Sequence, residues 1–202
     1  GMSAFSDLRR LPGALWLVAF ATLINRAGTM VQPFLVLYLT KSVGMNAELA
    51  GVMITLWGVA SLASAPISGW LCDRLGARPL IVGSLVGSAV VMFGYPQAKG
   101  TSEIIVATSL LAFVGDAFRP ASMTLFGELA PDGHSKTAFA LQRLAVNLGM
   151  AVGPVVGGIL ATRWFAALFY VDGATAVLAA VVLVIWMWRE RRLPDDPQQQ
   201  AP

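Results

Sequence analysis

The sequence predicts an all-α membrane protein with six transmembrane helices. Hydrophobic residues make up 56% of its 202 residues and charged residues only 12%, whereas soluble domains have about 25% charged and about 45–50% apolar residues. The apolar residues form six long runs separated by short polar turns, and each run can cross a hydrocarbon core of about 30 Å as a helix. Basic residues gather in alternate turns, which is typical of membrane proteins.

The six runs define the domain organisation. The first predicted helix covers residues 11–39 and is too long for the apolar core of a signal peptide. The others cover residues 49–71, 79–97, 103–129, 137–161 and 164–188. Residues 1–10 form a polar lead before this bundle of residues 11–188. Residues 189–202 form a basic cluster and a tail rich in Pro, Gln and Asp, for which we expect disorder.

An even number of spans places both termini on one side of the membrane. Eight basic residues fall on that side and three on the other. The eight are Arg9, Arg10, Arg74, Arg78, Lys136, Arg189, Arg191 and Arg192, and the three are Lys41, Lys99 and Arg163. By the positive-inside rule we expect both termini in the cytoplasm, and we expect a bacterial inner membrane as the location.

Among the charged residues inside predicted spans, three near helix centres are expected to cost most, at about 2.5–3.5 kcal/mol each on insertion scales. Arg26 is near the middle of the first helix, and Asp116 and Arg119 are near the middle of the fourth. They form either a structural ion pair between these helices or a polar cavity for substrate or protons. The cavity is favoured because buried ion pairs add little stability. Two bases against one acid predict a surplus positive charge, which suits an anionic substrate group or keeps Asp116 ionised.

Other polar and aromatic residues fall in the same spans. Asp172 is either a polar residue at the lipid interface or a second protonation site. Asn25 and Asn147 are expected to line the cavity, although Asn147 is equally suited to an interhelical hydrogen bond. Trp57, Phe34 and Phe118 could stack on a flat hydrophobic cation, which opposes the preference for an anion. The single Cys72 and single His134 argue against a disulfide framework or a metal site, so we expect no cofactor.

Small residues mark two further helices. Gly149, Gly153 and Gly157 recur every four residues and form one bare groove, with Gly158 beside them. Pro154 removes a backbone hydrogen bond and bends the fifth helix within this groove. We expect close packing of a neighbouring helix there. A stripe of small residues in the second helix predicts a similar approach; it comprises Gly51, Gly58, Ser61, Ala65 and Ser68.

A short charged island, residues 69–80, separates the second and third helices and is expected to be a loop. Its pattern Gly69-xxx-Asp73-Arg74-x-Gly76-x-Arg78 resembles the loop motif of major facilitator superfamily transporters. Three more stretches resemble motifs of that family: Asn25-Arg26-x-Gly28 in the first helix, Arg119 with Glu128 in the fourth, and residues 149–158 in the fifth. The chain resembles the N-terminal six-helix half of such a transporter, a 3+3 inverted repeat, and is most like the drug:proton antiporters. Ala77 departs from the pattern, since the family usually has a base there.

The resemblance implies proton-coupled efflux of a small molecule by alternating access between two halves. It implies that Asp73 faces a helix end in the other half and locks one state. It also implies that Arg74 and Arg78 pair with acids such as Glu128. Asp116 is our first candidate for the proton site, by its position in the span. The expected partners are the lipid bilayer, the substrate and protons, with no nucleic acid.

The length of the chain leaves alternatives open. The family needs two six-helix halves around one site, so we expect either a second half or a homodimer. The alternative is a non-transporting membrane fragment or scaffold. An enzyme is disfavoured because the sequence lacks the Gly-x-Ser-Gly nucleophile and the intramembrane His of a six-span protease.

Overall fold

The computed structural model describes Leu8 and residues 11–190. The predicted lead, with Arg9 and Arg10, and the predicted tail, with Arg191 and Arg192, lie almost wholly outside these residues. Within the described residues, six helical spans are long and apolar enough to cross a membrane, which confirms the predicted number. They are Gly13–Lys41, Ala47–Leu75, Ala77–Gln97, Thr101–Leu129, Ser135–Arg163 and Ala166–Glu190.

The first and fourth spans are each broken into two helices. The first consists of α2 (Gly13–Gly28) and α3 (Val31–Lys41), and the fourth of α6 (Thr101–Asp116) and α7 (Phe118–Leu129). The sequence predicts continuous helices at both places, and that prediction is wrong. Proline explains both breaks: Pro33 and Pro120 are the third residues of α3 and α7, and each lacks the N–H that would bond the carbonyl four residues earlier.

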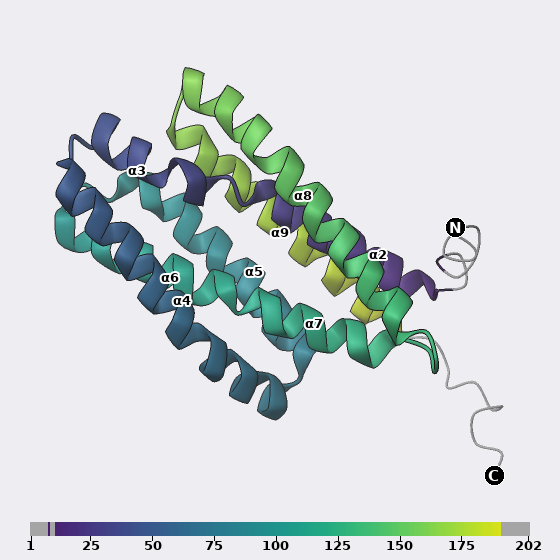
Figure 1. Ribbon diagram of the computed structural model, residues 1–202. Helices are drawn as coiled ribbons and strands as arrows, with labels where there is room; N and C mark the ends of the chain where they lie inside the picture. Colours follow the sequence, from purple (N-terminus) through teal and green to yellow (C-terminus); the bar gives the residue numbers. More distant parts are fainter. Residues whose placement is uncertain (1–7, 9–10, 191–202) are drawn as a thin grey trace, which may run out of the picture.

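The remaining spans are α4 (Ala47–Leu75), α5 (Ala77–Gly94) with the short 3₁₀ helix η1 (Tyr95–Gln97), α8 (Ser135–Arg163) and α9 (Ala166–Glu190). In the bundle α8 packs along α2, α4 packs along α6, and α5 packs along α9 (Figure 1). The start of α2 and the end of α9 lie at the same end of the bundle (Figure 1).

Spans one to three and spans four to six have the same construction. Each set begins with a broken span of 29 residues, followed by a helix of 29 residues. Pro66 of α4 and Pro154 of α8 lie inside these second helices, each at the same distance from the helix start. The helices of one set pack on those of the other, because α4 lies on the fourth span and α8 lies on the first. This is the predicted 3+3 arrangement.

The charged island is helical rather than a loop. Helix α4 continues to Leu75 and α5 starts at Ala77, so the turn is made at Gly76 alone. Gly76 has a φ of 88°, a left-handed conformation that glycine adopts without steric cost. Extending both helices carries Asp73 and Arg74, which are exposed, beyond the apolar parts of the spans.

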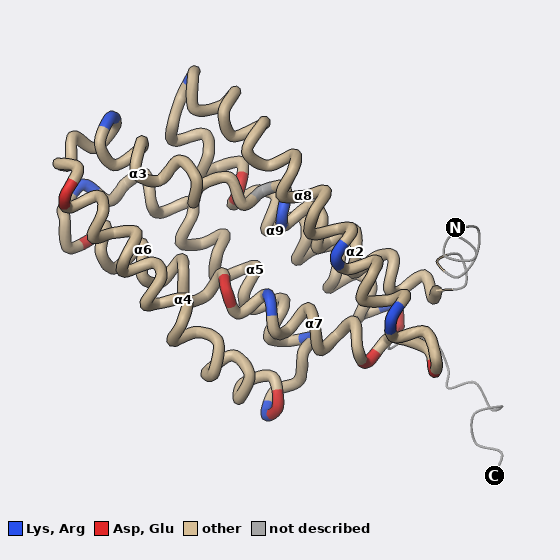
Figure 2. The backbone as a smooth tube through the Cα atoms, viewed as in Figure 1, with Lys and Arg blue, Asp and Glu red and all other residues tan. Residues whose placement is uncertain are grey.

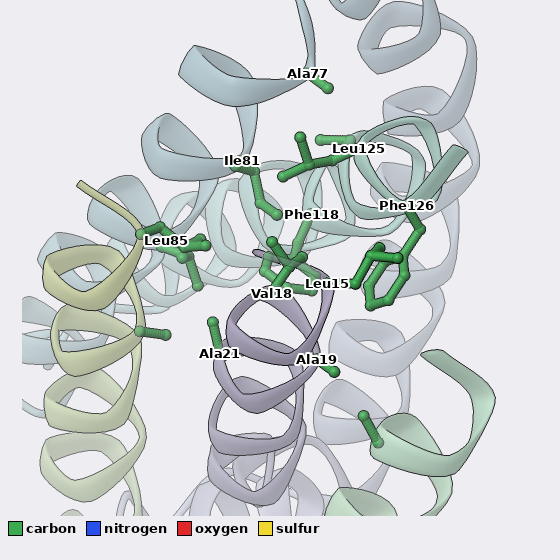
Figure 3. Packing of buried hydrophobic residues seen from close by; sticks show 14 of the residues in the cluster. Leu15, Val18, Ala19, Ala21, Ala77, Ile81, Leu85, Phe118, Leu125 and Phe126 are labelled. Carbon is green, nitrogen blue, oxygen red and sulfur yellow. The ribbon is translucent and has the colours of Figure 1, made fainter. Parts of the chain in front are cut away.

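The buried apolar side chains form two clusters along the length of the bundle. The first joins α2, α7 and the adjoining parts of α5, α8 and α9; in Figure 3 Leu15 and Val18 gather around Phe118. The second joins α3, η1 and the adjoining parts of α4, α6 and α9, with Leu35 and Phe169 fully buried. In lipid, close packing rather than hydrophobic transfer holds such helices together.

Two helices are much less covered than the others. In the most apolar 18-residue stretch of each span, 17% of α4 and 22% of α8 is buried, against 39–44% of the other four. A Cβ atom added to Gly51, Gly58 or Gly69 of α4 would meet no neighbouring atom within 4 Å. Of the predicted stripe on the second helix, Gly51, Gly58 and Ala65 are exposed within this chain and Ser68 is buried.

Candidate functional site

A cavity of about 190 Å³ lies between the two apolar clusters, next to both helix breaks. All six spans contribute to its wall. Its polar lining comes mainly from Asn25, Arg26, Gln32, Ser88, Asp116 and Asp172. Trp57, Met92, Leu111 and Met150 supply apolar wall. The described residues contain no group of three His, Cys, Asp or Glu side chains that could hold a metal ion.

Arg26 occupies the last turn of α2, where the partial negative charge of a helix C-terminus favours a cation. Its guanidinium lies 5.5 Å from the centre of the Phe118 ring. Asp116 and Asp172 attract it electrostatically, and Arg119 repels it. Within the described part of the chain the one ion pair under 4 Å joins Arg78 and Glu190, so a direct pair between the first and fourth spans is not formed.

Asp172 is buried, with 3% of its surface exposed. The backbone N–H of Val31, at the start of α3, donates a hydrogen bond to its carboxylate. Its second oxygen, Oδ2, has no hydrogen-bond partner among the described residues. Asp172 therefore faces the cavity and the first break, which rules out its alternative placement at the lipid interface.

Two predicted members lie outside this cavity. Arg119 and Asn147 are both exposed and do not contribute to its wall. Asp116 ends α6 and Arg119 belongs to α7, so the two lie on opposite sides of the break at Ala117. The cavity thus holds two acids and one base, and the surplus positive charge predicted from the sequence is reversed.

Hydroxyl groups satisfy backbone carbonyls at the breaks, and sequence reasoning did not identify these residues. Ser64 Oγ of α4 donates to the carbonyl of Phe113 at 2.6 Å, and Ser84 Oγ of α5 donates to that of Val114 at 2.7 Å. At the first break Thr29 Oγ1 donates to the carbonyl of Arg26 at 2.8 Å. An unpaired carbonyl in lipid is costly. The sequence signal for these residues is a serine within an apolar run of one helix, combined with a proline in another helix that leaves a carbonyl unpaired.

The glycine groove of α8 holds the first span. A Cβ atom on Gly149 would lie 2.6 Å from Cβ of Arg26, and one on Gly153 would lie 3.0 Å from the carbonyl oxygen of Ala27. A Cβ atom on Gly157 would lie 2.9 Å from Cβ of Met30. These contacts run along both sides of the break. Gly158 has only ordinary contact, at 3.8 Å from Phe34, and Pro154 lines the cavity.

The residues that resemble the gating motif make different contacts from those implied. Arg78 pairs with Glu190 at 2.5 Å and lies 5.1 Å from the centre of the Trp186 ring. Arg74 lies 4.4 Å from the centre of the Trp70 ring. Glu128 is exposed and forms no ion pair with any described residue. The pairing with Glu128 is therefore corrected, since the end of α9 supplies the acid instead.

Comparisons with known proteins agree with this architecture. A family model described as the Major Facilitator Superfamily matches residues 15–202. The chain is 26% identical over 171 residues to the "Uncharacterized MFS-type transporter YqjV" of Bacillus subtilis (strain 168), covering 84% of this chain and 42% of that protein. It is 28% identical over 186 residues to "Multidrug resistance protein MdtG" of Citrobacter koseri, covering 89% and 44%. It is 27% identical over 142 residues to the "Na(+), Li(+), K(+)/H(+) antiporter" of Planococcus maritimus, covering 68% and 33%.

Solved structures share the fold. A crystal structure of the peptide transporter POT in complex with alafosfalin matches with a TM-score of 0.78 at 21% identity, covering 86% of this chain and 38% of that one. The POT family transporter PepTSo matches with a TM-score of 0.78 at 17% identity, covering 93% and 40%. The chain thus spans less than half the length of these relatives and structures.

Proposed function

We propose, on the premise that this chain belongs to the major facilitator superfamily, that it forms one six-helix half of a transporter for small organic cations. The chain is an integral membrane transport protein rather than an enzyme. The observation that carries the proposal is the cavity at the two helix breaks, where Asp116 and Asp172 outnumber Arg26. A surplus negative charge in a low-dielectric site favours a cationic ligand.

The aromatic wall adds to this preference. Trp57 of α4 lines the cavity, and a cation held against the face of an indole ring is stabilised by about 0.5–2 kcal/mol. Broken transmembrane helices commonly surround transporter binding sites because their free ends can face a ligand. The proposed substrate is therefore a compact cation that carries an aromatic or apolar group.

We further propose that substrate and protons exchange at this site. Asp116 ends α6, lines the cavity, and makes no ion pair under 4 Å with any other described residue, and it attracts the Arg26 guanidinium across the cavity. We assign it as the acid that exchanges a proton for the cation. Competition of this kind couples efflux of the substrate to entry of protons. The names of two relatives, a multidrug resistance protein and a cation/proton antiporter, support this direction.

The uncovered faces of α4 and α8 support the need for a second half. These helices carry large exposed apolar side chains, including Leu62, Ile67, Val155 and Ile159, and they flank the cavity. We propose that a second six-helix half, or a second copy of this chain, covers them. Basic residues lie at both ends of the bundle (Figure 2), and their excess at the end that carries the termini supports a cytoplasmic location for that end in a bacterial inner membrane.

A non-transporting membrane fragment or scaffold is the second candidate, because the chain spans less than half of its relatives. Reconstitution in proteoliposomes separates the two. A proton gradient is imposed across the proteoliposomes and an aromatic quaternary ammonium is added. We expect the gradient to dissipate only when crosslinking shows paired chains or when a second half is present. Strong transport by chains that crosslink only as monomers would contradict the paired arrangement, and absence of transport in every paired state would favour the scaffold.

The variant Asp116→Asn tests the assignment of the exchanging acid. It preserves the size of the side chain and removes its charge, so we expect the coupling of cation movement to protons to fall at least tenfold, which is about 1.4 kcal/mol. Asp132→Asn is a matched control, because Asp132 is exposed in the turn between α7 and α8 and does not line the cavity. Unchanged coupling in Asp116→Asn would remove this residue from the mechanism.

A further inference from the structure

We infer that Asp172 is a positioning residue whose protonation releases α3, the second part of the first span, from the rest of the bundle. The inference rests on the proton-coupled transport proposed above. It deepens that proposal by naming α3 as the helix that moves when the proton binds. It starts from three observations: the N-terminus of α3 lacks a local cap, Asp172 takes the place of that cap, and half of its carboxylate has no partner among the described residues.

Because the first span is broken, the N-terminus of α3 lies inside the bundle, where its first residues, Val31 and Gln32, line the cavity. An α-helix begins with unpaired N–H groups and a partial positive charge, and α3 has 11 residues. The residue at its cap position is Met30, whose side chain makes no capping hydrogen bond and has no oxygen to do so. The local sequence therefore provides nothing for these N–H groups.

Asp172 supplies the missing cap from the sixth span. Its carboxylate accepts the hydrogen bond of the Val31 N–H, at the first residue of α3. It is a distant residue in the sequence, and it has only 3% of its surface exposed. A charged acceptor makes a stronger hydrogen bond than a neutral one, so the ionised form holds α3 most firmly.

The proton has a defined place to bind. Oδ2 of Asp172 is buried and has no hydrogen-bond partner among the residues that the structure describes. A proton taken up at Oδ2 cancels the charge of the carboxylate. Its attraction to the N-terminus of α3 and to the Arg26 guanidinium then falls together, which frees both sides of the first break at once.

The surroundings of Asp172 contain few other groups that titrate. Helix α2 contributes Arg26, and α6 contributes Asp116 across the cavity. Helices α4, α5 and α8 face the cavity with uncharged side chains. Tyr38 of α3 and Tyr95 of η1 pack their rings on Phe169, at 4.7 Å and 4.5 Å between ring centres. Arg26 is thus the charged group that acts on the Asp172 carboxylate, and Asp116 is the other charged side chain in the cavity wall.

The break of the fourth span provides an internal comparison for the break of the first span. Helix α5 holds the break of the fourth span through the Ser84 hydroxyl, as α9 holds that of the first span through Asp172. Each anchor belongs to the third span of one set and secures the broken first span of the other. A hydroxyl group cannot change its charge in the physiological range, so of these two anchors Asp172 alone responds to pH.

Distances between spin labels on α3 and α5 test the inference in the full chain reconstituted in lipid. Cys72 is replaced by Ser, and labels are attached through Leu37→Cys and Val90→Cys, because both positions are exposed. We expect the distance distribution to gain a second population as the pH falls. Asp172→Asn should give the low-pH distribution at every pH, whereas Ser84→Ala and Asp116→Asn should keep a pH-dependent change.

Two results would overturn the inference: a distribution that does not change with pH, or a pH response that survives unaltered in Asp172→Asn. If Asp172→Asn does not fold, Asp172→Ser copies the anchor of the other repeat and should likewise abolish the pH response. The infrared band of a protonated carboxyl group is a further readout. It should appear on acidification of the wild type and be reduced in the Asp172 variant.

Binding of benzyltrimethylammonium, measured on the same samples, separates this inference from the proposed function. Cation binding without any pH-dependent movement of α3 would overturn the inference and leave the proposed function intact. Movement of α3 that depends on Asp172 without any cation binding would leave the switch intact and contradict the proposed substrate.

Discussion

The first and fourth spans are both interrupted beside the same cavity, and different chemistry holds the two breaks. At the first break Thr29 and Met30 are non-helical, and the flanking helix ends face Arg26 and Asp172. At the fourth break Ala117 keeps nearly helical dihedral angles, with φ of −62° and ψ of −23°. There the carbonyls before the break bond to the neutral side chains of Ser64 and Ser84.

This difference assigns separate roles to the two spans. Neutral hydroxyl anchors keep the same strength when the pH or the ligand changes, so the backbone of the fourth span stays in place while Asp116 at its break exchanges proton and ligand. Charged anchors respond to protons and to a cation in the cavity, so the first span is the element that changes. The glycine groove of α8 packs closely against the first span on both sides of its break. Movement of the first span therefore takes place along this groove.

The largest effect on stability is expected for a substitution in the glycine groove of α8. Gly149→Ala would place a Cβ atom 2.6 Å from Cβ of Arg26 and 2.9 Å from the backbone nitrogen of Ala27. Because backbone atoms cannot move aside easily, we expect a loss of about 1–3 kcal/mol in unfolding free energy in detergent. Gly158→Ala is the matched control in the same motif, since its contact at 3.8 Å is ordinary. Equal losses in both variants would mean that the groove does not hold the first span.

A smaller effect is expected at the fixed break. Ser84→Ala and Ser64→Ala each remove a hydroxyl that bonds a carbonyl before Ala117, so each should lower the unfolding free energy by about 0.5–1.5 kcal/mol. Ser61→Ala is the control on α4, because the Ser61 hydroxyl is buried without a partner among the described residues. Its removal should be neutral or stabilising. If all three variants behaved alike, the hydroxyl bonds would not distinguish this break.

The smallest effect is expected for the charge pair at the end of the bundle. Arg78 and Glu190 each have 38% of their side-chain surface exposed, so solvent screens the pair. Glu190→Gln should change the unfolding free energy by about 0–1 kcal/mol, and added salt should reduce the difference further. A larger, salt-insensitive loss would show that charges at the end of the bundle matter as much as those at the first break.

The sequence predicted the features that depend on composition and spacing. Six apolar runs predict six crossings because each crossing of the lipid must be long and apolar. The repeat of Gly149, Gly153 and Gly157 predicts one bare helix face because the α-helix has a fixed period. The two breaks were not predicted, although Pro33 and Pro120 were visible. Proline is common in transmembrane helices, and whether it bends or interrupts one depends on hydroxyl groups and helix ends supplied by neighbours.

The charge balance of the cavity was missed for a related reason. Counting along a helix gives the depth of a residue, but the direction of its side chain depends on where the helix is interrupted. Arg119 shares the depth of Asp116 and lies outside the cavity, while Asp172 comes from a different span and lies inside it. A sequence-based count therefore gave the opposite sign of charge from the one the folded chain presents.

The affinity of the reconstituted chain for two ligands of similar size and opposite charge tests the central claim most directly. Benzyltrimethylammonium carries a positive charge and phenylmethanesulfonate a negative one, and both have one aromatic ring. Calorimetric titration should show that the cation binds at least tenfold more tightly, a difference of about 1.4 kcal/mol, and that Asp116→Asn reduces this preference. Tighter binding of the anion would contradict an acid-dominated cavity at the paired helix breaks.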